Sequence, residues 1–281
     1  MIFEKIEFNS IYFDIFKLDE GIYAIIFNQE MGSSSNAGIF DLGNKTIIFD
    51  TLMDPFSTRD LIKASKLITN KDPFLLINSH FHLDHVFGNR LFPSSMPIIS
   101  SPGTLDQFNK QLLEQFKQFK ERAPTELKNT KELLKNVEDP NKKIELQNDM
   151  VTWKEIQAPN FDLRPPDLLL YNKVLINGVS RSVEIINIGS AHSHDDIIAL
   201  FPEKKICFMG DLLFTNLDPS WATGSTGMSF AVDPKNFKNI METYFEKNIE
   251  VFVPGHGTLS SKKGVKDTIE YLEKYFLKKE D

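Results

Sequence analysis

The sequence predicts a layered α/β fold, in which two similar βα halves pack sheet against sheet and carry helices on their outer faces. Two observations support this prediction. In each half of the chain, short apolar runs typical of strands come first, and amphipathic helical patterns follow. The chain also has no short-period repeat and no low-complexity linker, which favours a single domain over residues 1–281. With 281 residues and 41% hydrophobic side chains, such a domain can bury a substantial core.

Three strands are predicted near the start of the chain. Ile22–Phe27 follows a glycine and is almost wholly apolar, as expected of a buried strand. Asn36–Leu42 and Lys45–Phe49 are further apolar runs, and Gly43-Asn44 lies between them. A short Gly-Asn connection between two such runs favours a β-hairpin.

A helix and a further strand are predicted next. Ser57, with Asp60 three residues later, resembles a capping box and predicts a helix that begins there and runs to about Leu67. The polar segment Asn70-Lys71-Asp72-Pro73 would end this helix. The continuous apolar run Phe74–Asn78 then predicts a strand that is buried on both faces.

Residues 104–157, named here the helical insertion, differ in character from the rest of the chain. They are charged and helical in pattern, and Pro124 and Asp139-Pro140-Asn141 are predicted to break them into two or three helices. One apolar stripe recurs at spacings of three and four residues. Its members are Leu105, Phe108, Leu112, Phe116 and Phe119. The insertion is interpreted as a packed side layer, as a lid that shapes substrate access, or as a contact between two copies in a homodimer.

The second half repeats the order of strands followed by helices. Its predicted strands are Lys173–Ile176, Val183–Ile188, Ile197–Phe201, Ile206–Met209 and Val251–Val253. Asp233-Pro234 predicts the start of a helix that reaches about Lys247, because proline is favoured in the first helical turn. Ser260 or Ser261 is expected to cap a terminal helix.

Composition limits the class of partner and the type of metal ligand. The net charge is −7, which argues against nucleic acid, since its binders need a concentrated basic surface. No run of about 18 apolar residues is present, so no membrane span is expected, and the chain is predicted to be cytoplasmic. Cys207 is the only cysteine and lies in an apolar run, typical of a core residue. Any metal is therefore expected to bind nitrogen and oxygen atoms.

Three of the six histidines fall within six residues, in the string His80-Phe81-His82-Leu83-Asp84-His85. Alternate side chains of an extended segment project to one side, so His80 and His82 can bind one ion together. If a helix begins just afterwards, Asp84 and His85 turn towards a neighbouring position. One loop can thus contribute to two adjacent metal sites.

The other histidines also follow predicted buried strands. His192 and His194 come after Val183–Ile188, Asp211 follows Ile206–Met209, and His256 follows Val251–Val253. In layered α/β folds, functional side chains gather beyond the carboxyl ends of strands.

Imidazole and carboxylate ligands suit zinc, manganese or iron, and the nitrogen-rich set favours zinc. His194 stays open as a replacement for His192, as a pocket residue or as a surface residue. Asp50 and Asp196 are candidates for orienting the ligand imidazoles, with a turn or capping role as the alternative for each.

The order His80-x-His82-x-Asp84-His85, then His192, Asp211 and His256, resembles the metallo-β-lactamase superfamily. Asn36–Asp50 also resembles its opening hairpin, so that the resemblance covers nearly the whole chain outside the helical insertion. It implies a four-layer αβ/βα sandwich with the site at one edge of the two sheets. It further implies that His80, His82 and His192 bind a first metal ion, that Asp84, His85 and His256 bind a second, and that Asp211 bridges both.

The expected function is a binuclear, metal-dependent hydrolase of a small carbonyl substrate, such as a thioester, a lactone or another ester or amide. Two neighbouring cations lower the pKa of a shared water by about eight units, giving a metal-bound hydroxide that Asp84 can orient. Asp211 stands where the antibiotic-degrading class with a metal-binding cysteine has Cys, which implies the broader hydrolase branch. The alternatives are a phosphodiesterase or nuclease, and a redox or sensor protein with little hydrolysis. Pocket walls are expected from Asn216–Phe230 and from the helical insertion.

Overall fold

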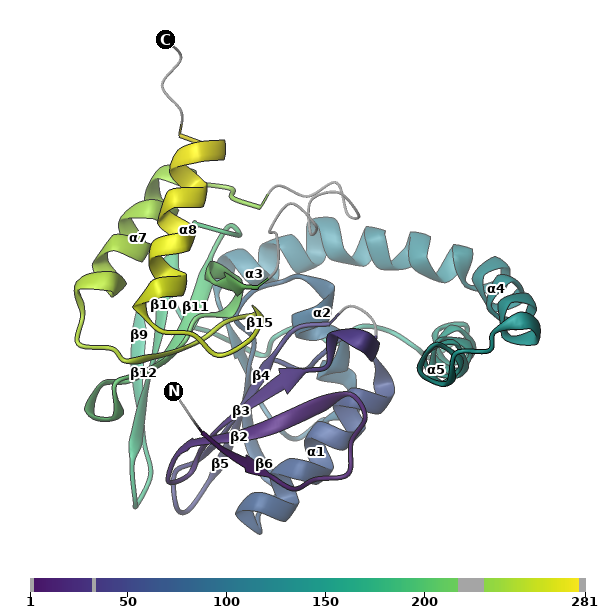
Figure 1. Ribbon diagram of the computed structural model, residues 1–281, viewed down its shortest axis with the longest axis horizontal. Coiled ribbons are helices and arrows are strands. Elements are labelled where there is room, and N and C mark those ends of the chain that lie inside the picture. The colour runs from purple at the N-terminus through teal and green to yellow at the C-terminus, as the bar shows by residue number, and fades with distance from the viewer. Residues whose placement is uncertain (1–2, 32–33, 217–229, 278–281) are drawn as a thin grey trace.

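The computed structural model describes residues 3–31, 34–216 and 230–277, and its sheets and helices are shown in Figure 1. The first sheet has eight strands in chain order, of which β1 to β5 are antiparallel neighbours and β5 to β8 are parallel. The strands are β1 (Glu4–Ile6), β2 (Phe13–Asp19), β3 (Ile22–Phe27), β4 (Ala37–Asp41), β5 (Thr46–Phe49), β6 (Pro73–Ile77), β7 (Ile98–Ser100) and β8 (Leu168–Leu169).

The second sheet has the strand order β14-β12-β11-β10-β9, and a small parallel pair, β13 and β15, lies apart from it. These strands are β9 (Lys173–Asn177), β10 (Ser182–Gly189), β11 (Asp196–Phe201), β12 (Ile206–Phe208), β13 (Phe214–Thr215), β14 (Val251–Val253) and β15 (His256–Gly257). The main helices are α1 (Pro55–Thr69), α2 (Leu83–Val86), α3 (Pro102–Gln107), α4 (Leu113–Asn136), α5 (Pro140–Ile156), α7 (Pro234–Glu246) and α8 (Lys262–Tyr275).

Three apolar clusters define four layers. Between the two sheets, Phe40 of β4 meets Phe208 of β12 at a ring-centroid distance of 4.7 Å. Leu61 of α1 packs on the outer face of the first sheet, and Phe237 of α7 belongs to the cluster on the outer face of the second. Alternation along each strand sends side chains to both faces, so each sheet buries one face against its helices and the other against its partner sheet. The predicted α/β sandwich is confirmed.

The helical insertion contains α3, a π-helical turn at Phe108–Leu112, and the α4–α5 pair. Figure 1 shows α4 projecting from the body of the two sheets. Phe108, Leu112 and Phe116 of the predicted stripe are buried. The predicted break at Asp139-Pro140 is present, since Asp139 caps α5 and Pro140 opens it.

Three local predictions were wrong. Helix α1 begins earlier than Ser57, because the Asp54 carboxylate accepts hydrogen bonds from the backbone N–H groups of Phe56 and Ser57 and so caps the helix. Pro124 does not break α4, which runs unbroken from Leu113 to Asn136 with the exposed proline inside it. Phe74 in β6 is 53% exposed, so only the second half of that strand is buried on both faces. Among the helices of the described residues, none is long and apolar enough to cross a membrane.

Candidate metal centre

The seven predicted side chains come from four loops, each of which follows a strand. β6 leads to His80, β10 to His192, β12 to Asp211, and β14 to His256. The extended backbone at His82 precedes α2, and that single helical turn carries Asp84 and His85 to the other side of the loop. The strand ends of two different sheets therefore bring the seven side chains together.

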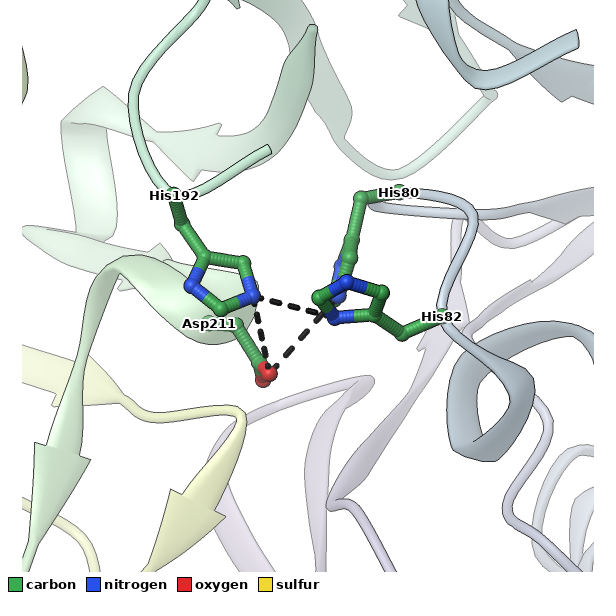
Figure 2. Close-up of side chains that lie close together, drawn as sticks. All are labelled: His80, His82, His192 and Asp211. Atoms are coloured by element: carbon green, nitrogen blue, oxygen red, sulfur yellow. Dashed lines mark hydrogen bonds and ion pairs between the residues drawn. The ribbon is translucent and has the colours of Figure 1, made fainter. Parts of the chain in front are cut away.

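His80, His82, His192 and Asp211 form a first group, whose nearest ligand atoms all lie within 4.8 Å of one another. Figure 2 shows the rings pointing towards one another over the Asp211 carboxylate. His192 Nε2 lies 3.1 Å from His82 Nδ1 and 3.4 Å from Asp211 Oδ2, and His80 Nε2 lies 3.7 Å from the same oxygen. One cation at this position would be within reach of three imidazoles and a carboxylate.

Asp84, His85 and His256 form a second group beside the first. His256 Nε2 lies 3.1 Å from Asp84 Oδ2, and His85 Nε2 lies 3.7 Å from it. The other oxygen of Asp211, Oδ1, is 3.1 Å from His85 Nε2 and 3.4 Å from His256 Nε2. Asp211 thus faces the first group with one oxygen and the second group with the other.

The hydrogen bonding of the cluster is consistent with bound cations. Three buried atoms of the cluster have no hydrogen-bond partner among the described residues, namely His80 Nε2, His85 Nε2 and Asp211 Oδ1. Buried polar atoms are costly when they are left unpaired, by about 1–3 kcal/mol each. Imidazole nitrogens and carboxylate oxygens are atoms that bind zinc in proteins. The residues present therefore fit a metal ion at each group.

The pKa values of the histidines are shifted in opposite directions in the two groups. Burial, with help from neighbouring imidazoles, holds the pKa of His80 well below its ordinary value and lowers the pKa of His82 to about 3. Burial acts the same way on His256, but the Asp211 and Asp84 carboxylates outweigh it and raise the pKa of His256 to about 9. The second group therefore attracts positive charge strongly, whereas His80 and His82 of the first group offer neutral imidazole nitrogens.

Neighbouring residues contact the Nδ1 atoms of His80, His85 and His192. The Asp50 carboxylate lies 2.8 Å from His85 Nδ1 and also accepts the backbone N–H of Ser79 at 2.7 Å. The Ser79 hydroxyl lies 3.0 Å from His80 Nδ1, and the carbonyl of Phe230 lies 2.8 Å from His192 Nδ1. Such contacts fix the tautomer and the angle of a ligating ring. Of the two open roles for Asp50, the structure favours orientation of an imidazole.

Asn36 was not singled out in the sequence, yet it connects the two halves at the site. Its backbone N–H donates to Gly255 O at 2.6 Å, and its side-chain amide donates to Pro254 O and Gly257 O, both at 2.9 Å. Its side-chain oxygen accepts the N–H of Phe27 at 2.9 Å. These bonds flank His256 on both sides. The only sequence signal was an asparagine at the start of a predicted strand.

The remaining candidates lie away from the ring nitrogens. His194 is exposed, whereas His192 is buried in the cluster. Asp196 accepts hydrogen bonds from the backbone N–H and the hydroxyl of Ser193, so it holds the loop that follows His192. Cys207 is fully buried in the core, and burial raises the pKa of its thiol. Of the expected pocket wall Asn216–Phe230, residues 217–229 lie outside the described residues.

Comparisons with solved structures show the same overall fold in known proteins. DIM-1 metallo-beta-lactamase is 18% identical, with 94% of this chain and 98% of that chain covered and a TM-score of 0.62. A metallo-beta-lactamase from Pontibacter korlensis is 15% identical, with coverages of 97% and 99% and a TM-score of 0.60. FIM-1 from Pseudomonas aeruginosa, solved in a mono-zinc form, is 17% identical, with coverages of 94% and 96% and a TM-score of 0.62.

These identities establish a shared fold and leave activity open. No curated protein matches the chain significantly. A family model for the metallo-beta-lactamase superfamily matches residues 31–256, from the segment between β3 and β4 to the last histidine of the cluster. With this match and the sandwich fold, the chain belongs to the metallo-β-lactamase superfamily.

Proposed function

We propose that the chain is a binuclear, metal-dependent hydrolase that acts on a small carbonyl substrate. In this proposal His80, His82 and His192 hold one metal ion, Asp84, His85 and His256 hold the other, and Asp211 lies between them. Zinc is the proposed metal, because it accepts imidazole and carboxylate ligands, and manganese or iron are the alternatives.

The observation that carries the proposal is the convergence of seven ligand side chains, most of them buried, at two adjacent points. The ring nitrogens of His80 and His85 and one oxygen of Asp211 lack hydrogen-bond partners within the described part of the chain. Seven ligand side chains also exceed what one four-coordinate ion can use, which supports two ions. The mono-zinc form of FIM-1 supports zinc as the metal.

Bound metal ions would supply Lewis acidity, which makes water more acidic and polarises a carbonyl group. The side chain of Asp84 is 22% exposed, whereas that of Asp211 is 4% exposed. Burial tends to raise its pKa, but the charges of His85 and His256 outweigh this and lower it to about 2. Asp84 is therefore ionised at neutral pH and can orient an attacking water by accepting a hydrogen bond from it.

A carbonyl substrate is favoured over a phosphodiester or a redox reaction. The net charge of −7 gives a poor surface for nucleic acid. His82 and His85 are both in place, whereas redox relatives of this fold typically alter that motif. Asp211 occupies the position at which the antibiotic-degrading class with a metal-binding cysteine has Cys. Thioesters, lactones and other esters or amides are the proposed substrates.

A substrate screen with a matched variant tests the proposal. Thioesters, lactones, lactams and phosphodiesters are offered to zinc-loaded protein, and to Asp211→Ala prepared in the same way. We expect turnover of a thioester, lactone or simple ester that falls by orders of magnitude in Asp211→Ala, with the circular-dichroism spectrum unchanged. Turnover that survives in Asp211→Ala, or turnover of phosphodiesters alone, would refute the proposal.

A further inference from the structure

The loop that carries His80, His82, Asp84 and His85, named here the metal loop, packs against the helical insertion. Its alternate residue Phe81 and the following residues Val86 and Phe87 belong to an apolar cluster. The same cluster contains three residues of the apolar stripe of the insertion, namely Phe108, Leu112 and Phe116. The rings of Phe87 and Phe116 lie 6.3 Å apart in an edge-on arrangement. The insertion thus forms the surface on which the metal loop rests.

The residues just before the insertion, at the start of α3, hold the loop that carries His192. The Asp195 carboxylate accepts the backbone N–H of Gly103 at 2.9 Å, and the Asp195 carbonyl accepts the hydroxyl of Ser101 at 3.0 Å. Gly103 permits this approach, since a Cβ atom at that position would lie 2.5 Å from the Cβ of Asp195. Asp195 lies three residues after His192, in the second half of the fold.

The far end of the insertion returns to the first half. Glu155, near the end of α5, receives two hydrogen bonds from the Arg59 guanidinium in α1, at 3.0 and 3.1 Å. The segment that leads into the insertion and the last helix of the insertion are therefore both attached to the body of the molecule, and three members of the apolar stripe pack in one cluster with Phe81 of the metal loop.

We propose that the helical insertion is a brace for the metal centre, with Phe116 and Asp195 as positioning residues. Phe116 supports the metal loop, which contributes to both groups of ligands, whereas Asp195 fixes only the His192 loop. This inference rests on the proposed metal site. It adds that Phe116 and Asp195, neither of which belongs to the two groups of ligands, determine how tightly the metal ions bind.

Metal affinity, measured on folded protein, tests the brace. Zinc binding to metal-free protein is followed by calorimetry, and cobalt(II) absorption reports the ligand geometry. Contacts behind a metal ligand typically change affinity on the order of 10-fold to 100-fold. We expect Phe116→Ala to weaken the binding of both ions by on the order of 10-fold or more. Asp195→Ala should weaken the ion held by His192 more than the other ion.

Matched variants separate positioning from general stability. Leu146→Ala removes a buried side chain of the same insertion that does not belong to the cluster under the metal loop. We expect it to lower the melting temperature while leaving zinc affinity unchanged. Phe116→Leu should restore most of the affinity. Asp195→Asn should do so as well, because an amide oxygen still accepts the Gly103 N–H.

The outcomes distinguish this inference from the function on which it rests. If wild-type protein binds two ions and Phe116→Ala binds them equally tightly, while both Phe116→Ala and Leu146→Ala lose stability, the insertion only stabilises the fold and the brace is wrong. If wild-type protein itself binds no zinc or cobalt(II), the proposed function fails and the brace fails with it.

Discussion

At the scale of residues, the histidine cluster could be predicted and its supports could not. The string from His80 to His85 predicts a metal site by spacing alone, because alternate side chains share one side of an extended loop. Asn36 gives no such signal, since the two carbonyls that its amide group binds lie more than 200 positions away along the chain. An amide that bonds to distant backbone carbonyls has no local pattern. Tertiary geometry alone identifies it.

Replacing Asn36 should disturb the second ion selectively. Asn36→Ala leaves two carbonyls beside His256 and the N–H of Phe27 without their partner, which predicts a loss of about 1–3 kcal/mol in the free energy of unfolding. Thr46→Val is the control, because it removes a different buried hydrogen bond. This bond joins Thr46, the first residue of β5, to Thr69 at 2.9 Å. Stepwise zinc titration should show weaker binding of the second ion in Asn36→Ala only. If the second zinc ion binds Asn36→Ala and Thr46→Val equally tightly, Asn36 does not support the second metal site.

Cys207 should be unreactive in the folded protein. Burial raises the pKa of its thiol, so the reactive thiolate is rarer in the folded than in the unfolded chain. A folded-state pKa above the unfolded value means that ionisation favours unfolding, so the free energy of unfolding should fall as the pH rises past 9.0, the ordinary pKa of the thiol. A thiol reagent should label the protein only in denaturant. Fast labelling of native protein would show that Cys207 is accessible.

At the scale of elements, the strands that the sequence predicted are present in the predicted order, but β1, β2, β7, β8, β13 and β15 were not predicted and some boundaries were misplaced. The Gly43-Asn44 hairpin was predicted because its turn residues are local signals. The start of α1 was missed because Ser57 and Asp60 imitate a capping box, while the effective cap is Asp54 before Pro55. Pro124 was read as a break, yet contacts between α4 and α5 keep the helix continuous. Tertiary packing overrides a local preference there.

Replacing Pro124 should therefore stabilise α4. An interior proline lacks the N–H of a helical hydrogen bond and costs about 3 kcal/mol relative to alanine in a helix, partly offset by its restriction of the unfolded chain. We expect Pro124→Ala to raise the free energy of unfolding in urea by on the order of 1–2 kcal/mol, with zinc affinity unchanged. A loss of stability would mean that the proline ring makes contacts that the helix needs.

At the scale of the whole molecule, the fold places functional loops from both halves at one edge of the sandwich. The resemblance to the superfamily predicted this arrangement, and the family match and the two packed sheets confirm the fold. The contact of the insertion with both metal-bearing loops could not be predicted. An amphipathic stripe shows that a helix face is buried, but it does not identify what covers that face.

Bound metal should also stabilise the whole chain. An ion that binds only the folded state adds about 2.7 kcal/mol at a free concentration of 100 times its Kd. We expect a chelator to lower the melting temperature of wild-type protein and to have much less effect on Asp211→Ala, which lacks the carboxylate facing both groups of ligands. Differential scanning calorimetry with and without the chelator measures this. Equal shifts in the two proteins would argue that the metal ions bind elsewhere.

Whether the seven side chains hold two ions is measured by the number of metal ions per chain. Protein purified without added metal, and again after reconstitution with zinc, is analysed for its elements alongside His256→Ala. We expect about two ions per chain, mainly zinc, because seven ligands exceed the need of one four-coordinate ion. We expect one ion fewer in His256→Ala. No metal after reconstitution, or one ion whether or not His256 is present, would contradict the two-ion site.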